Sequence, residues 1–126
     1  MSRFALTAGA IFCGLSVTFG AFGTHAIADW VTAARLDTWQ TSSRFLMNHG
    51  LALLILGGLS LLLKHSFKRP ICLLFSGASV FCASLFLLVI LNMPWLGAIA
   101  PIGGLLMIIG WIDTAITLFR TPLYER

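Results

Sequence analysis

A polar stripe enters one of the apolar parts of this chain. Gln40, Arg44 and Asn48 recur every four residues, and His49 follows Asn48 directly. Residues four apart lie on one face of an α-helix, so the spacing predicts a polar stripe along one side of a helix. Guanidinium, amide and imidazole groups are costly in hydrocarbon unless they are paired, and we therefore expect the stripe to face protein or water.

Two more polar residues, His25 and Asp29, stand where the first apolar run ends, in the stretch SVTFGAFGTHAIADW of residues 16–30. A bundle of short helices would bring them close to the stripe, because both groups lie at a similar depth. We therefore predict one polar cluster, which is a candidate site for a lipid or a protein partner. Its candidate residues are His25, Asp29, Arg44, Asn48 and His49.

Three kinds of chemistry are open to such a cluster: a lipid-headgroup pocket, a proton-relay pair, or a metal pair made by His25 and His49. Two histidines without a third ligand are a weak indication of a metal, so we predict no metal site and no cofactor. Acid–base catalysis would need a nucleophile or substrate pocket that the sequence does not display, so we predict no catalytic residue. We favour a structural cluster that ties the outer segment to the bundle, ahead of a lipid or partner site.

Asp113 is a separate candidate, because it is an acid inside an apolar run. It precedes Arg120 by seven residues, which places it about 10 Å deep at a rise of about 1.5 Å per residue. An ionisable group at that depth is a functional hypothesis by default. We favour a simpler interpretation, a buried carboxyl that is protonated or paired with Thr114, Thr117 or Lys64, since no other predicted span contains an acid.

The composition shows what must position these groups. Of 126 residues, 59% are hydrophobic and only 10% are charged, against about 25% in soluble domains. A soluble domain of this length could not hide so much apolar surface, so lipid is the expected solvent. The net charge of +4 is not arranged as a basic stripe between exposed aromatic residues, which argues against nucleic acid as a partner. Cys13, Cys72 and Cys82 all lie in apolar runs, and we expect them to behave as small hydrophobic residues.

Four apolar runs are long enough to cross about 30 Å of hydrocarbon as helices. They cover residues 4–22, 44–63, 70–91 and 96–119, with Pro101 near the start of the last. The runs are continuous and lack the alternation of barrel strands, so helices are expected. The sequence therefore predicts an all-α integral membrane protein with a single domain, a bundle of four transmembrane helices over residues 1–126.

Residues 24–43 are too polar to span a membrane. Ile27, Trp30, Val31 and Ala34 follow the spacing of one helical face, which predicts a short amphipathic helix lying in the outer interface. Asp37 would then cap the second membrane helix. The first run is also longer than the apolar part of a signal peptide, so we expect it to remain as a span.

The basic residues predict the orientation. With an even number of spans, one side carries Arg3, Lys64, Lys68, Arg69, Arg120 and Arg126. The other side carries only Arg35 and Arg44, together with Trp30, Trp39 and Trp95 as an interfacial aromatic belt. Basic loops stay in the cytoplasm, so both termini are expected there.

Small residues indicate how the spans pack. Without a hydrophobic driving force in lipid, helices associate through close backbone approach at Gly, Ala and Ser. The first run has Gly9 and Cys13 four residues apart, and the last has Gly103, Gly104 and Gly110. The segment NMPWLGAIAP, residues 92–101, predicts a tight hairpin that makes the last two helices antiparallel neighbours.

Three motifs carry a resemblance: GAFGTHA (20–26), HGLALL (49–54) and PIGGLLMIIGW (101–111). They resemble the YgdD/YwdK-like family of small bacterial inner-membrane proteins, which carry a domain of unknown function. Thr24 and Gly50 stand where that family has alanine. The resemblance implies a multi-span protein of the bacterial inner membrane with no established reaction. Its motif positions here are His25, His49 and the turn formed by Pro101, Gly103 and Gly104.

The expected function is a non-enzymatic four-helix protein that binds membrane lipids or a partner, either a further copy of the chain or another membrane protein. One alternative is an oligomeric small transporter or proton-coupled permease that uses Asp113 or the pair His25 and His49. A second alternative is a lipid-modifying enzyme at the outer face, with His25 and Asp29 as acid and base. It requires a continuous polar cavity that reaches both residues.

Overall fold

The computed structural model describes residues 1–122, apart from the side chain of Thr24. It contains α1 (Ser2–Phe22), a π-helical extension η1 (Gly23–Ile27), α2 (Ala33–Leu62), α3 (Lys68–Leu91), a 3-10 turn η2 (Pro94–Ala98) and α4 (Ala100–Arg120). Four helices are long and apolar enough to cross a membrane, and there is no β-strand in the described residues. The predicted all-α architecture with four spanning helices is confirmed. Arg126, one of the basic residues counted above, lies outside the described residues.

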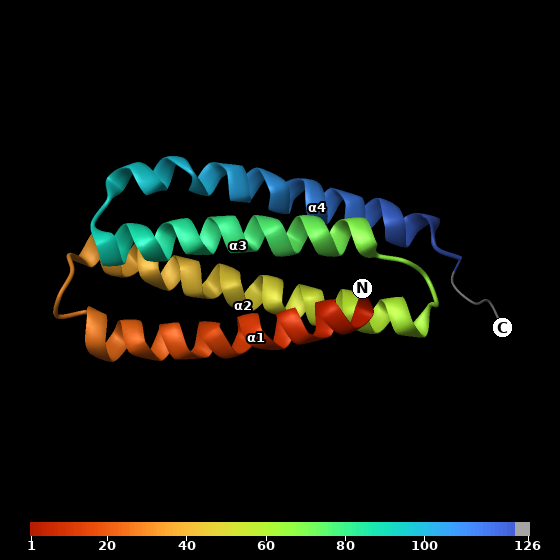
Figure 1. Cartoon of the computed structure of the whole chain (residues 1–126), viewed down its shortest axis with the longest axis horizontal. Helices are drawn as coiled ribbons and strands as arrows, with labels where there is room; N and C mark the ends of the chain where they lie inside the picture. Colours follow the sequence, from red (N-terminus) through yellow and green to blue (C-terminus); the bar gives the residue numbers. More distant parts are fainter. Residues whose placement is uncertain (123–126) are drawn as a thin grey trace.

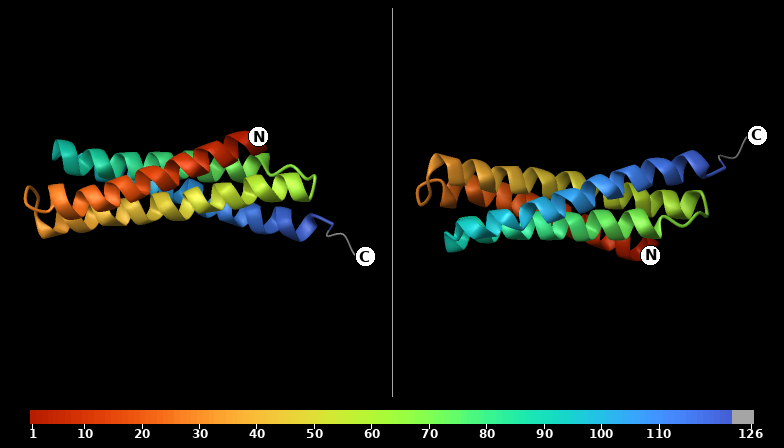
Figure 2. Two further views of the ribbon diagram at one scale, coloured as in Figure 1. Left: turned by 90° about the horizontal axis from the view of Figure 1, so that it is seen from below. Right: turned by 90° about the horizontal axis from the view of Figure 1, so that it is seen from above.

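The four helices run side by side, and consecutive helices are antiparallel (Figure 1). In that view α2 and α3 lie in the middle of the bundle, while α1 and α4 lie on its two outer sides. One end of the bundle holds the N-terminus, the connection 63–67 and the end of α4 (Figure 2). The opposite end holds the connections 23–32 and 92–99, where the candidate site lies.

Two glycine contacts hold the helix pairs together. A Cβ on Gly9 of α1 would lie 2.6 Å from the carbonyl oxygen of Gly50 in α2. In the second pair, a Cβ on Gly103 of α4 would lie 2.7 Å from the carbonyl oxygen of Gly77 in α3. Both contacts bring backbone against backbone, as expected for small residues in lipid. The predicted antiparallel pairing of the last two helices is confirmed.

Polar and aromatic contacts act both between these pairs and within the first pair. The Ser42 hydroxyl of α2 donates to the carbonyl of Cys82 in α3 at 3.1 Å, and the Cys82 thiol donates back to the Ser42 carbonyl at 3.4 Å. Between α1 and α2, the Ser16 hydroxyl donates to the Ser43 carbonyl at 2.7 Å. The ring of Phe12 in α1 stacks on Phe75 of α3 with centroids 5.4 Å apart. Hydrogen bonds and ring stacking between the helices therefore add to the backbone contacts at the glycines.

The separate interfacial helix predicted for residues 24–43 is absent. Residues 23–27 continue α1 as a π-helical turn, residues 28–32 form a turn, and α2 begins at Ala33. Thr32, not Asp37, caps α2: its backbone is extended, and its hydroxyl oxygen accepts the N–H of Arg35 at 3.3 Å. The reason is packing, because the first turns of α2 bury Trp39 and Ser42 inside the bundle.

The last predicted span, 96–119, is divided between two elements. Residues Pro94–Ala98 form a 3-10 turn, and α4 starts at Ala100 with Pro101 in its first turn, as expected for a residue without an N–H. Asn92 ends α3 in the left-handed conformation at φ 52°, a conformation that asparagine tolerates. The Asn92 side chain lies at this end of the bundle, in contact with Arg35 at the start of α2.

Candidate functional site

Trp39 organises the end of the bundle that holds the first connection. Its side chain is only 2% exposed, and its indole N–H donates to the carbonyl of Phe19 at 2.6 Å. The ring packs edge-on against Phe86 of α3, with centroids 4.6 Å apart. A Cβ on Gly23 would overlap the indole ring, so only glycine fits beneath it. The prediction that Trp39 belongs to an outer aromatic belt is therefore wrong, because this ring packs between three helices.

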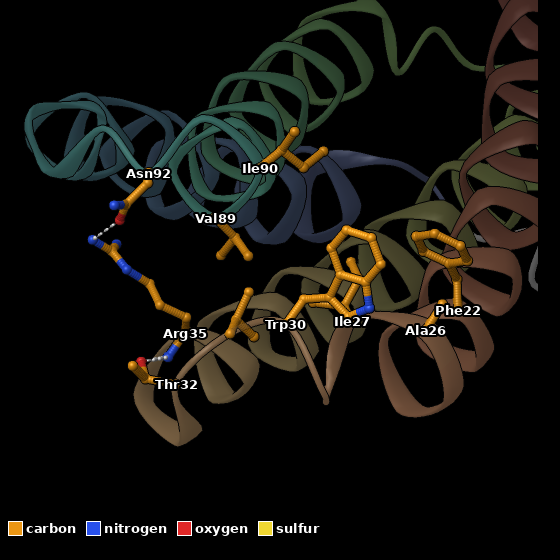
Figure 3. A pocket seen from close by; sticks show the side chains of 10 residues that line it. Phe22, Ala26, Ile27, Trp30, Thr32, Arg35, Val89, Ile90 and Asn92 are labelled. Atoms are coloured by element: carbon orange, nitrogen blue, oxygen red, sulfur yellow. Dashed lines mark hydrogen bonds between the residues drawn. The ribbon is translucent and has the colours of Figure 1, made fainter.

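A groove of about 900 Å³ lies at this end of the bundle, between the first connection and the end of α3 (Figure 3). Most of its wall is apolar, and its polar residues are Thr32, Arg35 and Asn92. Its apolar lining consists of Phe22, Ala26, Ile27, Trp30, Val31, Val89 and Ile90. Figure 3 shows Arg35 and Asn92 at one end and Phe22 at the other, so the groove has a polar and an apolar end.

Arg35 provides the charge at the polar end. One guanidinium nitrogen donates to the Asn92 side-chain oxygen at 3.3 Å, a contact that joins α2 to the end of α3. Among the described residues, no carboxylate forms an ion pair with this guanidinium. A guanidinium carries five N–H donors in a planar fork, so most of them remain available to an anion. Arg35 and Asn92 were not among the predicted site residues.

The predicted site residues do not form one cluster. His25 and Asp29 are exposed on the first connection, and Arg44 and Asn48 are exposed on the outer face of α2. Arg44 donates to the Thr41 hydroxyl at 3.1 Å, a contact within its own helix. Within the described part of the chain, no hydrogen bond or ion pair joins any two of the five candidates.

His49 is buried and joins α2 to α4. Its Nε2 accepts the indole N–H of Trp111 at 3.2 Å, and its Nδ1 lies 2.9 Å from the Phe45 carbonyl. Because an indole only donates, this arrangement assigns the proton to Nδ1 and leaves the ring neutral. Both ring nitrogens are therefore occupied by protein partners. In the part of the chain that the structure describes, no group of three His, Cys, Asp or Glu residues could hold a metal.

Asp113 is buried in α4, as predicted, but its partner differs from the predicted ones. One carboxylate oxygen lies 3.4 Å from the guanidinium of Arg69, at the start of α3, whose side chain is 83% exposed. The other oxygen, Oδ2, is buried without a hydrogen bond in the described residues. The Thr114 hydroxyl donates to the Gly110 carbonyl instead, at 2.8 Å. A cation at the end of a long side chain therefore reaches the acid from the adjacent helix.

The residues of the predicted motif turn serve packing. Gly103 forms the close contact with α3, whereas a Cβ on its neighbour Gly104 would meet nothing within 4 Å. Pro101 is exposed in the first turn of α4. In the sequence, Arg35 stands out only as a positive charge. Asn92 carries a signal that could have been used, because an Asn directly after a long apolar run is typical of the left-handed end of a helix.

Fold and groove together define a small multi-pass membrane protein built almost entirely from its spanning helices. The family model for DUF423, described as a protein of unknown function, matches residues 19–104. A UPF0382 membrane protein of Staphylococcus aureus (strain bovine RF122 / ET3-1) is 38% identical over 112 residues, covering 89% of this chain and 92% of the relative. A UPF0382 membrane protein of Staphylococcus haemolyticus is 37% identical over the same share of this chain. The chain therefore belongs to the DUF423 family. No solved structure matches it.

Proposed function

We propose that this protein is a non-enzymatic membrane protein that binds an anionic phospholipid in the groove between the first connection and the end of α3. The observation that carries the proposal is the Arg35 guanidinium, which has no carboxylate partner among the described residues and stands at the polar end of an apolar groove. A phosphate accepts two parallel N–H donors from such a fork. The apolar walls suit an acyl chain.

The neighbours of Arg35 support the same ligand. Asn92 holds the guanidinium from the side and keeps its own amide N–H groups available, while the Thr32 hydroxyl can donate to a phosphate oxygen. Trp30 is 88% exposed at the groove and Trp95 is 62% exposed on the neighbouring connection. Exposed indole rings favour the headgroup level of a bilayer. The polar end of the groove is thus suited to lie at that level.

We further propose the bacterial inner membrane as the location, with both termini in the cytoplasm. Support comes from the bundle end that holds Arg3, Lys64, Lys68, Arg69 and Arg120, against Arg35 and Arg44 towards the other end. The three motifs quoted above support a place among the YgdD/YwdK-like members of the family. The permease and enzyme alternatives find less support, because both nitrogens of His49 are engaged and Asp113 is paired with Arg69.

Native mass spectrometry of the protein extracted from vesicles of equal phosphatidylglycerol and phosphatidylcholine tests the lipid proposal. We expect the wild type to retain phosphatidylglycerol selectively, and Arg35→Gln to lower that retention about tenfold, since hydrogen bonds to charged groups contribute about 1.5–3 kcal/mol. Lys68→Gln is the matched control, because it removes one exposed positive charge at the opposite end of the bundle. Equal retention of both lipids by the wild type, or unchanged retention in Arg35→Gln, would overturn the proposal.

A further inference from the structure

The outer face of α2 carries residues at alternating spacings of four and three. They are Arg44, Asn48, Leu51, Ile55, Gly58 and Leu62, and we refer to them as the α2 seam. Ile55 is 61% exposed and Leu62 is 79% exposed. A Cβ on Gly58 would meet nothing within 4 Å. This is the heptad spacing with which one helix packs along another in a left-handed coiled coil.

Asn48 is the residue of this seam that lipid cannot satisfy. It is exposed, and its amide forms no hydrogen bond with the described residues. It lies one helical turn, about 6 Å, further into the apolar part of α2 than Arg44. A guanidinium can extend from Arg44 back to the headgroups, but the short Asn48 side chain cannot. An amide at this depth requires a protein partner.

The exposed face of α4 shows that exposure alone does not indicate a protein partner. Ile102, Leu105, Ile109, Ile112 and Ile116 are also exposed at the same alternating spacing. All five side chains are aliphatic, and acyl chains surround them as well as another helix would. Of these two faces, only the one on α2 combines the heptad spacing with a polar group.

We propose that a second copy of this chain packs on the α2 seam, with the two α2 helices parallel and the two Asn48 amides hydrogen-bonded across a two-fold axis. A carboxamide both donates and accepts, so it is complementary to itself, as a symmetric interface demands. Copies inserted with the same orientation bring their α2 helices together in parallel. A single Asn in the core of a coiled coil is also known to fix register and dimeric state.

The rest of the seam fits the same partner. The heptad places Asn48, Ile55 and Leu62 in one core position and Leu51 and Gly58 in the other. A β-branched residue in the first position with leucine in the second favours two-stranded coiled coils. Gly58, where an added Cβ would meet nothing within 4 Å, lets two backbones approach closely. The seam thus provides an amide that fixes the register, apolar side chains for packing, and a glycine at which the two helix backbones can approach closely.

The charges on this face also suit a second copy. Arg44 of each chain would lie near Arg44 of the other, which is unfavourable unless an acid is close. Asp37 lies one heptad earlier on the same face, is exposed, and forms no ion pair in the described residues. Helix side chains lean towards the N-terminus, so Arg44 of one copy reaches towards Asp37 of the other.

Single-molecule photobleaching of the labelled full chain in lipid bilayers, over a range of protein densities, tests this interface. We expect two-step bleaching for the wild type and a dissociation constant about tenfold higher for Asn48→Leu, because that substitution removes the hydrogen bonds between the two amides; tenfold corresponds to about 1.4 kcal/mol. Leu105→Ala on the exposed face of α4 is the control and should leave dimerisation unchanged. One-step bleaching of the wild type at all densities, or an unchanged constant for Asn48→Leu, would refute the proposal.

Disulfide trapping locates the contact independently of affinity. In a chain with Cys13, Cys72 and Cys82 replaced by alanine, Leu51→Cys should form a cross-linked dimer in membranes under mild oxidation. Leu105→Cys in the same background should form no cross-link, because α4 lies outside the proposed interface. Thermal unfolding of each variant verifies that the bundle is intact. If folded Leu51→Cys protein forms no cross-link, the α2 seam is not the dimer interface. Lipid retention is measured in a separate experiment, so the dimer proposal can fail while the lipid proposal holds, and the reverse.

Discussion

The indole ring of Trp39 lies directly over Gly23, in the space that a glycine Cβ would occupy. The contact joins α2 to the end of α1, and the indole N–H is held by the Phe19 carbonyl four residues before Gly23. It therefore fixes the angle at which the first connection leaves the bundle. One wall of the groove is formed by this connection.

Replacing Gly23 with alanine should destabilise the protein, because the new methyl group forces the buried indole to move. We expect a loss of about 1–3 kcal/mol, the usual range for overpacking a core. Thermal unfolding in detergent micelles measures it. Gly14→Ala is the control, since a Cβ there meets nothing within 4 Å, and it should match or exceed the wild-type stability.

The neighbouring glycines of α4 offer a second comparison. A Cβ on Gly103 would lie 2.5 Å from the backbone nitrogen of Phe81, and backbone cannot move aside as a flexible side chain does. Gly103→Ala should therefore cost about 1–3 kcal/mol by separating α3 from α4. Gly104→Ala changes the adjacent residue on the open side and should be neutral or stabilising. Equal stability of the two variants would contradict the observed packing.

The hydrogen bond from Trp111 to His49 should contribute measurably to stability. A double-mutant cycle with His49→Leu and Trp111→Phe isolates the pair from the loss of each side chain alone. We expect a coupling energy of about 0.6 kcal/mol and at most about 1.7 kcal/mol, the mean and the largest value measured for such bonds between membrane helices. A coupling of zero in unfolding experiments would show that the two side chains act independently.

Asp113 and Arg69 should respond unequally to substitution. Arg69→Gln leaves a buried carboxylate without its cation, whereas Asp113→Asn removes the charge itself and leaves an exposed arginine in water. The first change should therefore destabilise more than the second, which should cost about 1 kcal/mol or less. The free energies of unfolding of both variants at neutral pH show which substitution destabilises more. Proton-coupled flux into vesicles that disappears in Asp113→Asn would instead favour the permease alternative.

The spanning helices could be predicted because runs of about 20 apolar residues leave the backbone no alternative in lipid. The start of α2 could not, because Ala33 to Ser43 reads as polar and becomes helical core through contacts of Trp39, Ser42 and Ser43 with other helices. Local patterning carries no information on those distant partners.

For the polar residues, too, the sequence predicts part of the structure, whereas their partners depend on distant parts of the chain. His49 and Asp113 are buried, as the cost of polar groups in hydrocarbon predicts, whereas Arg44 and Asn48 are exposed. The partners of the two buried groups, Trp111 and Arg69, are 62 and 44 positions away in the chain. Arg35 and Asn92 meet because two connections lie at one end of the bundle, which depends on how the helix pairs dock. Such encounters are decided by tertiary geometry.

The two glycine contacts have a consequence for how the chain is made. Each lies within one half of the sequence, Gly9 with Gly50 and Gly77 with Gly103, on either side of the connection 63–67. A ribosome-bound nascent chain can thus complete its first hairpin before the second is synthesised. Two polypeptides divided at residue 65 and expressed together should each insert as a preformed hairpin and reassemble in the membrane.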